Sequence, residues 1–158
     1  MPKITPFLWF DDKAEEAANL YVSIFPNSKI IDVARYSEAG PAPAGSVMTV
    51  AFSLDGQELI ALNGGPHYKL SHAISLFVSC ETQEEVDALW EELLAGGGAP
   101  SQCGWLVDRY GLSWQIIPRV LGELMQDTDP AKAKRVTEAM FKMIKIDIAA
   151  LKKAYAGE

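Results

Sequence analysis

CGWLVDRYGLSWQIIP, residues 103–118, is the stretch that decides the fold of the second half of the chain. Two apolar runs, 104–107 and 112–117, flank the four residues DRYG at 108–111. A short turn that places Gly where the backbone needs an unusual φ, between runs rich in Trp, Val and Ile, predicts a β-hairpin. Two Trp residues in so short a hairpin supply much of the apolar surface that one sheet has to bury.

The second run of this hairpin carries a polar residue, Gln115, among apolar ones. Successive side chains of a strand point to opposite faces of the sheet. One face of the predicted strand takes Leu112, Trp114 and Ile116, and the other takes Ser113, Gln115 and Ile117. If the first face packs on helices, the second faces something that tolerates an amide.

Outward from the hairpin, each half of the chain shows the same order of elements. The first half predicts a strand at 3–10, a helix capped by Asp11-Asp12 and ended by Pro26-Asn27, and strands at 29–36, 46–54 and 58–63. Asp55-Gly56, between the last two strands, is a strong hairpin signal. The second half predicts a strand at 72–79, an acidic amphipathic helix at 81–95 stopped by three Gly, a short extended piece at 99–102, and the Trp hairpin.

Two β-α-β-β-β modules followed by helices predict an α+β fold in which a curled mixed sheet surrounds a cleft. We expect a single domain, 1–158, made of a first module at 1–65, a second module at 66–118 and a C-terminal helical tail at 119–158. In the tail, Thr128-Asp129-Pro130 reads as a cap, and the apolar stripe from Val136 to Leu151 predicts one long helix over 131–155.

The charge balance limits the partners of this chain. A formal net charge of −7 over 158 residues leaves no basic face for phosphates, so we expect no nucleic acid and no anionic membrane surface as a partner. Two cysteines, Cys80 and Cys103, form neither a metal spacing nor a disulfide framework, and there is no leader-like or membrane-spanning run. These features favour the cytoplasm.

Several motifs of catalysis and cofactor binding are missing from the sequence. It contains no Gly-x-Ser-x-Gly elbow, no phosphate loop and no dinucleotide fingerprint, and Gly96–Gly98 follows a helix rather than preceding one. Cys103 has no nearby His to form a thiolate, so an inert thiol is expected. We therefore expect no cofactor.

Three stretches carry a family resemblance over essentially the whole chain. PFLWFDDKAEEAANLYVSIFPNSKI, GWLVDRYGLSWQIIP and KRVTEAMFKMIKIDIAALKKAY resemble the PhnB-like family of the vicinal oxygen chelate superfamily, which also contains glyoxalase I, bleomycin-resistance proteins and extradiol dioxygenases. In the metal-using members, His, Glu or Gln ligands sit on the first and last strands of each half. The resemblance implies the same cleft here, and a two-fold homodimer that in some members exchanges halves.

The metal ligands do not carry over to this chain. The matching positions read Thr5, Ala61, Ala73 and Gln115, and alanine cannot ligate a metal. A shift of one residue would bring in His72, which still gives too few ligands, and His72 is more simply a residue at the start of a strand. His67 is more simply a loop residue at the rim of the cleft. We therefore expect no metal.

The same alternation predicts which residues line the cleft and bind a ligand. They are Thr5, Phe7, Trp9, Ala61, Asn63, Ala73, Ser75, Phe77, Ser113 and Gln115. Such a wall is aromatic with a few uncharged hydrogen-bonding groups, which is typical of a small-molecule pocket. The alternative, that the aromatic residues among them only fill a core, stays open.

Two classes of function stay open at this point, and the sequence does not decide whether the chain is an enzyme. The first is a metal-free protein that binds a small molecule. The second is a metal-dependent enzyme of the glyoxalase or dioxygenase type acting on a vicinal-oxygen substrate. A purely structural dimer is a third. The methyltransferase label sometimes given to this family has no support in the residues, because the Gly-rich loop of a methyl-donor site is missing.

Overall fold

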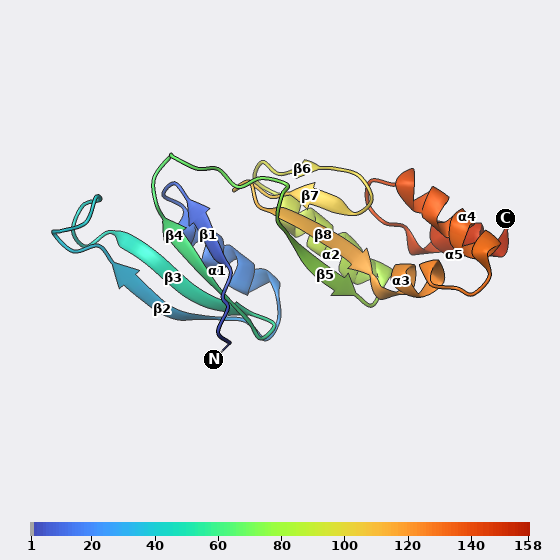
Figure 1. The fold of residues 1–158 in the computed structure, drawn as a ribbon, viewed down its shortest axis with the longest axis horizontal. Coiled ribbons are helices and arrows are strands. Elements are labelled where there is room, and N and C mark those ends of the chain that lie inside the picture. Colours follow the sequence, from blue (N-terminus) through green and yellow to red (C-terminus); the bar gives the residue numbers. More distant parts are fainter. Residues whose placement is uncertain (1) are drawn as a thin grey trace. The chain divides into compact units, whose positions relative to one another are not determined.

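The computed structural model describes residues 2–158, and the chain divides into two compact units, Met1–Leu70 and Ser71–Glu158 (Figure 1). The first unit contains four strands and one helix. In chain order its elements are β1 (Phe7–Phe10), α1 (Ala14–Ile24), β2 (Lys29–Arg35), β3 (Val47–Leu54) and β4 (Gln57–Asn63).

The second unit repeats this order and then continues into helices. Its elements are β5 (Ser75–Cys80), α2 (Gln83–Leu94), β6 (Ala99–Pro100), β7 (Trp105–Val107), β8 (Ser113–Pro118), α3 (Arg119–Met125), α4 (Pro130–Phe141) and α5 (Ile148–Ala156). The predicted α+β class and the two β-α-β-β-β modules are confirmed.

The two sheets have the same topology. The strand order is β1-β4-β3-β2 in the first sheet and β5-β8-β7-β6 in the second. In each sheet the outer pair, β1 with β4 and β5 with β8, is parallel, and the other neighbours are antiparallel. The internal repeat predicted from the sequence is therefore a repeat of strand connectivity as well.

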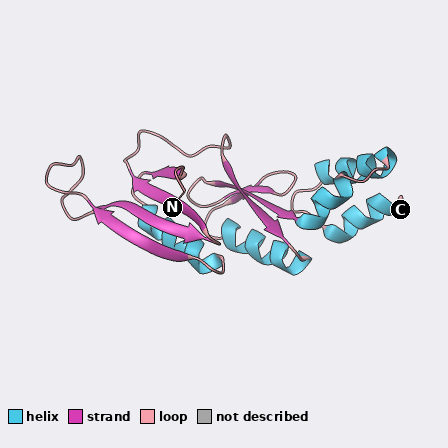
Figure 2. Cartoon of the chain, turned by 60° about the horizontal axis from the view of Figure 1, so that its bottom comes forward, coloured by secondary structure: helices cyan, strands magenta, loops and turns pink. Residues whose placement is uncertain are grey.

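Each sheet is covered by its helix on one face, and the core of each unit lies there (Figure 2). In the first unit the apolar side of α1 packs on residues that are almost fully buried: Leu8, Phe10, Val50, Phe52, Leu59 and Ala61. In the second unit α2 contributes Val86, Leu89, Trp90 and Leu93 to a core with Leu106, Trp114 and Ile116. The second face of each sheet is not covered by the helix of its own module.

The two predicted hairpins are present. Asp55 and Gly56 join β3 to β4 with φ angles of 48° and 85°, which is the backbone that a two-residue hairpin turn requires. In the Trp hairpin, Leu106 pairs with Trp114 on the buried face and Trp105 pairs with Gln115 on the opposite one.

The long helix predicted over 131–155 is wrong, because the chain breaks it into α4 and α5. Asp129 caps α4 as predicted, but the helix ends at Phe141. Asp147 starts a new helix by accepting a hydrogen bond from the backbone N–H of Ala150 (3.1 Å). Between them, the carbonyls of Met143 and Ile144 accept from the N–H groups of Cys103 and Gly104 (2.9 and 2.8 Å), which a continuous helix would not permit.

Two predicted boundaries also change. Asp11 and Asp12 do not cap α1: the cap position is Lys13, and the first helical N–H, that of Ala14, is satisfied by the Asn63 side chain instead. Strand β5 begins at Ser75 rather than at 72, because His72 and Ala73 form a turn. Among the described residues no helix is long and apolar enough to cross a bilayer.

Candidate functional site

The open face of the first sheet carries Phe7 and Trp9, as the sequence predicts, but it does not carry Ala61 and Asn63. In the parallel pair of β1 with β4, Leu8 lies beside Ala61, and Trp9 beside Leu62. Ala61 is 0% exposed and belongs to the core under α1. The predicted alternation of β4 is therefore wrong by one residue, and Ile60 and Leu62 occupy the positions expected for Ala61 and Asn63.

Asn63 has a structural role in the first unit. Its Oδ1 accepts from the N–H of Ala14 at the start of α1 (2.8 Å), and its Nδ2 donates to the carbonyl of Val47 (3.2 Å). Tyr36 donates its hydroxyl proton to the Asn63 carbonyl (2.5 Å). These bonds tie α1, β3 and β4 together and use both ends of the amide.

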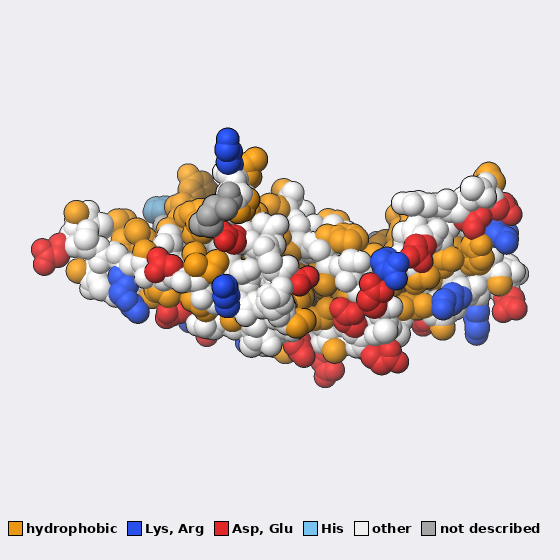
Figure 3. All heavy atoms as spheres, turned by 90° about the horizontal axis from the view of Figure 1, so that it is seen from below, with side chains coloured by type: hydrophobic (Ala, Val, Ile, Leu, Met, Phe, Trp, Pro, Cys, Tyr) orange, Lys and Arg blue, Asp and Glu red, His pale blue; other side chains and the backbone are white. Residues whose placement is uncertain are grey.

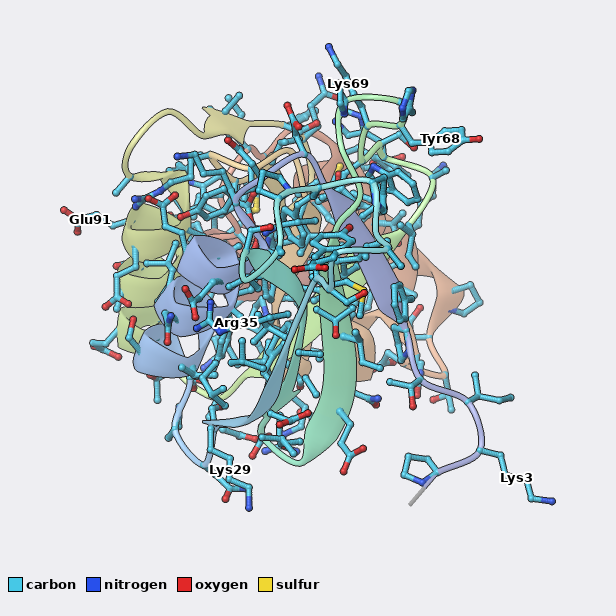
Figure 4. The ribbon with its side chains drawn as sticks, turned by 90° about the vertical axis from the view of Figure 1, so that its left-hand side faces the viewer. Lys3, Lys29, Arg35, Tyr68, Lys69 and Glu91 are labelled. Atoms are coloured by element: carbon cyan, nitrogen blue, oxygen red, sulfur yellow. The ribbon has the colours of Figure 1, made fainter. Side chains whose placement is uncertain are left out.

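Trp9 is held by the loop that follows β4. Its Nε1 donates to the carbonyl of Gly65 (2.9 Å), and its ring meets that of Tyr68 edge-on, with 4.9 Å between centroids. Tyr68 and Lys69 project from this loop (Figure 4). Thr5 precedes β1 and is half-buried, and Phe7 is exposed on the open face.

The second unit brings together four of the predicted residues. In the pair of β5 with β8, Ser75 lies beside Ser113 and Phe77 beside Gln115, all on the face opposite α2. Ala73 is not among them, because it lies in the exposed turn before β5. Trp105, which is opposite Gln115 in β7, shares this face; the antiparallel register of the hairpin could have identified it.

Polar groups on this face are only partly paired. Gln115 donates from Nε2 to the Oγ of Ser75 (3.0 Å), and its side chain makes no further hydrogen bond within residues 2–158. The Oγ of Ser113 is buried and has no hydrogen-bond partner in the described part of the chain. Buried polar groups in native proteins nearly always have a partner, so this hydroxyl calls for a water or a ligand.

A hollow of about 570 Å³ lies beside this face. Its lining comes from β5, β7, β8, the loop before β7 and helices α3 and α4: Phe77, Ser101, Gln102, Cys103, Trp105, Gln115, Ile117, Leu121, Gly122, Met125, Met140 and Phe141. The sequence predicted Phe77 and Gln115 but none of the helical residues. Nothing in a single sequence indicates that α3 and α4 bring side chains to the same hollow as β8.

Asp108 holds the hairpin that presents Gln115. Its buried carboxylate accepts from the N–H groups of Tyr110 (2.8 Å) and Leu112 (3.1 Å) and from the Nε1 of Trp114 (2.8 Å). These bonds fix the turn and the orientation of Trp114 on the core side. Gln115 directly follows Trp114 in β8, so the hydrogen bonds to Asp108 also set the position of Gln115 on the open face.

The donors at this site do not fit a metal ion. The positions that ligate in metal-using relatives read Thr5, Ala61, Ala73 and Gln115, of which Ala61 faces the core and Ala73 lies outside the strand. No group of three or more His, Cys, Asp and Glu side chains comes together within residues 2–158. Gln115 beside serine hydroxyls is a weak neutral donor set, whereas zinc and iron sites use imidazole, thiolate or carboxylate.

The two thiols have different environments. Cys80 is buried at the end of β5, and this burial, with smaller contributions from Glu85 and Glu81, raises its thiol pKa to about 12. Cys103 is half-buried and contributes to the lining of the hollow. Neither forms a disulfide.

Comparison with known proteins gives a family match over most of the chain. The model of the family described as 3-demethylubiquinone-9 3-methyltransferase matches residues 2–117. The PhnB protein of Bacillus cereus is 40% identical, with a TM-score of 0.67, and the match covers 74% of this chain and 99% of that one. No curated protein matches the sequence significantly.

More distant structures share the fold. A protein of Pseudomonas aeruginosa is 19% identical with a TM-score of 0.60, over 75% of this chain and 98% of that one. The fosfomycin resistance protein FosX of Listeria monocytogenes is 16% identical with a TM-score of 0.52, over 78% and 97%. The family match ends at residue 117, so helices α3, α4 and α5 lie beyond it.

Proposed function

The chain belongs to the 3-demethylubiquinone-9 3-methyltransferase family, the PhnB-like family of the vicinal oxygen chelate superfamily, and we propose that it is a metal-free protein that binds a small molecule on the open face of its second sheet. The observation that carries this proposal is the group of Gln115, Ser75 and Ser113. It combines an amide and hydroxyls with spare hydrogen-bonding capacity in a surface that is otherwise apolar and aromatic. Of these three residues, Gln115 lines the hollow of about 570 Å³, and a placed polar group in a largely apolar hollow is typical of small-molecule sites.

The proposal does not include the methyl transfer in the family's description. A methyl-donor site normally has a Gly-rich loop between a strand and a helix, and the loop between β1 and α1, residues 11–13 (DDK), contains no Gly. Calorimetry with S-adenosylmethionine at millimolar concentration should give no heat of binding. A saturating isotherm would restore methyl transfer as the function.

The proposal also excludes a resident metal, because the donor set described above does not fit one. The melting temperature should be the same with and without EDTA. A metal ion that binds only the folded state would raise the melting temperature, and EDTA would remove that effect. A melting temperature that falls on chelation, or about one metal per chain by elemental analysis, would favour the metal-dependent enzyme instead.

We further propose a cytoplasmic homodimer. Phe7 and Ile31 of the first sheet are exposed apolar side chains, and a second copy would shield them from water. Both cysteines are free, as in proteins of a reducing compartment. On the face seen in Figure 3, acidic, basic and hydrophobic side chains are mixed and no broad basic area is visible.

Native mass spectrometry of the protein purified from cells tests the binding function directly. We expect a small organic molecule retained by the wild-type chain and lost in Gln115→Leu, with unchanged melting temperature of the ligand-free protein. If wild type and Gln115→Leu retain the same molecule equally, the site lies elsewhere. If the wild-type chain retains no molecule and a fragment screen by thermal shift also finds no binder, the binding function itself is wrong.

A further inference from the structure

We propose that the C-terminal helices α3 and α4 complete this binding site as one wall of a groove, and that the groove takes a neutral, largely apolar ligand with at least one hydrogen-bonding group. The inference rests on the proposed function, because it assigns a ligand class and a specificity-determining element to the same site. The family match ends before these helices begin, so the wall is a feature of this chain beyond the matched core.

The wall is part of the folded unit. Leu121, Val136, Ile146 and Leu151 form a buried core of their own, with Ile117 of β8 packed against it. The Gln83 side chain of α2 holds the segment before α5 through both amide ends, donating to the Ile146 carbonyl (3.0 Å) and accepting from the Ile148 N–H (2.8 Å). Figures 1 and 2 show the three helices gathered beyond the end of β8.

The lining has no charged group. Among its twelve residues there is no Asp, Glu, Lys, Arg or His, although the chain as a whole carries a net charge of −7. Arg119, at the start of α3, is engaged by Glu81 (2.9 Å) and Glu123 (2.7 Å) on the exposed side of the helix. A charged ligand would lose water in the groove without gaining a counter-charge, so a neutral one is favoured.

The shape and chemistry of the wall point to an apolar body. Met125 and Met140 present flexible thioethers, which adapt to flat or irregular apolar groups. Phe77 from the sheet and Phe141 from α4 are 61% and 64% exposed, so a ligand in the groove would remove aromatic surface from water. The amide of Gln115, bonded once to Ser75, supplies a directed hydrogen bond, and Ser101 and Gln102 are the other lining residues with hydrogen-bonding side chains.

Gly122 offers a way to fill the groove without disturbing the fold. It lies inside α3 on the groove wall, its φ is not positive, and a Cβ built there meets no atom within 4 Å. Leucine is a better helix former than glycine, so Gly122→Leu should fold at least as well as wild type while its side chain enters free space beside the groove. Ile144→Ala is the matched control, because Ile144 is an exposed apolar residue of the same region outside the lining.

The test uses two dyes with the same aromatic amine frame, neutral N-phenylnaphthylamine and anionic anilinonaphthalene sulfonate, titrated into the full chain and followed by fluorescence. We expect saturable binding of the neutral dye at one site per chain and binding of the anionic dye weaker by about tenfold or more. Gly122→Leu should weaken the neutral dye by about tenfold or more. Ile144→Ala should bind it like wild type. Circular dichroism and thermal unfolding of each variant establish that the folds are equal.

Each other result overturns the inference in a recognisable way. Equal affinity for both dyes would contradict a neutral ligand. Loss of neutral-dye binding in Gln115→Leu but not in Gly122→Leu would leave the proposed function standing and remove the helices from the site. An affinity that falls as protein concentration rises would show that a second copy covers the groove. If the neutral dye does not bind while native mass spectrometry finds a retained molecule that depends on Gln115, the ligand class is wrong and the binding function is kept.

Discussion

Gln115 and Trp114 are neighbours in β8 with opposite roles. Trp114 is 1% exposed in the core under α2, whereas Gln115 lies half-buried on the open face. We predict that Trp114→Ala lowers the free energy of unfolding by about 3–5 kcal/mol, because it empties a core position. Gln115→Leu should cost little stability and weaken a cognate ligand by about 1–3 kcal/mol.

Denaturant unfolding of the two variants side by side measures the difference in their free energies of unfolding. A thermal-shift ligand screen measures the loss of ligand affinity in Gln115→Leu. Trp114→Ala also removes the indole N–H that donates to the buried Asp108 carboxylate (2.8 Å). The loss of unfolding free energy should therefore lie toward the upper end of the range of about 3–5 kcal/mol. Equal destabilisation by the two substitutions would mean that Gln115 supports the fold rather than a ligand.

The buried thiol of Cys80 should be chemically inert in the folded protein. Burial raises its pKa to about 12, so it stays protonated at pH values where an ordinary thiol ionises, and the thiolate is the reactive form. We predict that a thiol-specific reagent labels Cys103 alone in the native chain and both cysteines after denaturation. Cys103→Ser should abolish the native labelling.

The same pKa has a consequence for stability at high pH. Because the folded pKa of Cys80 is raised, the unfolded chain loses this proton first, and stability must fall as pH rises from the ordinary thiol value of 9.0 toward about 12. The slope due to this group is at most about 1.4 kcal/mol per pH unit. A Cys80→Ala variant should lack that part of the slope.

At the scale of elements, the packing of the C-terminal helices depends on one side chain of α2. Gln83 bonds to the backbone of both Ile146 and Ile148, and Lys145 pairs with Asp87 of the same helix at 2.7 Å. We predict that Gln83→Ala, which leaves these two backbone groups without their partner, destabilises the docked segment 143–148 by about 1–3 kcal/mol.

Hydrogen exchange measures this effect locally. The amides of α5 and of Cys103 and Gly104, which donate to Met143 and Ile144, should lose protection in Gln83→Ala, whereas those of β3 in the first unit should not. Gln57→Ala is a suitable control, because Gln57 bonds only locally, to the carbonyl of Glu58. Unchanged protection in α5 would show that the apolar core of the three helices suffices to hold them.

At the scale of the whole molecule, we predict a homodimer in solution. Exposed Phe7 and Ile31 leave apolar surface on the first sheet, which a second copy can bury. Light scattering at micromolar concentration should return about twice the chain mass of 17.3 kDa. Phe7→Ser should shift the equilibrium toward monomer, whereas Phe141→Ser, at a similarly exposed residue of the ligand groove, should not; a wild-type mass near 17.3 kDa would refute the dimer.

The sequence by itself determined the local structure of most of the chain. The turns at Asp55-Gly56 and at 108–111, the Asp129 cap and the helical spacing of α1 and α2 are local signals, because each depends on residues a few positions apart. The repeated order of these elements was enough to predict the α+β class and the two modules. Alternation within a strand was also enough to group Ser75 with Phe77 and Ser113 with Gln115, whereas the register of β5 with β8 brings the two pairs to one face.

Only the tertiary structure decided the rest, because it depends on contacts between residues far apart in the sequence. The face taken by Ala61 is set by its pairing with Leu8 and Val50, and the role of Asn63 by the start of α1, 49 positions away. The break between α4 and α5 is set by Cys103 and Gly104, whose N–H groups donate hydrogen bonds to the carbonyls of Met143 and Ile144. The groove needs residues of β8 and α4 to line one hollow, and no pattern within either element contains that information, because burial and hydrogen bonding across such distances arise only when the chain is folded.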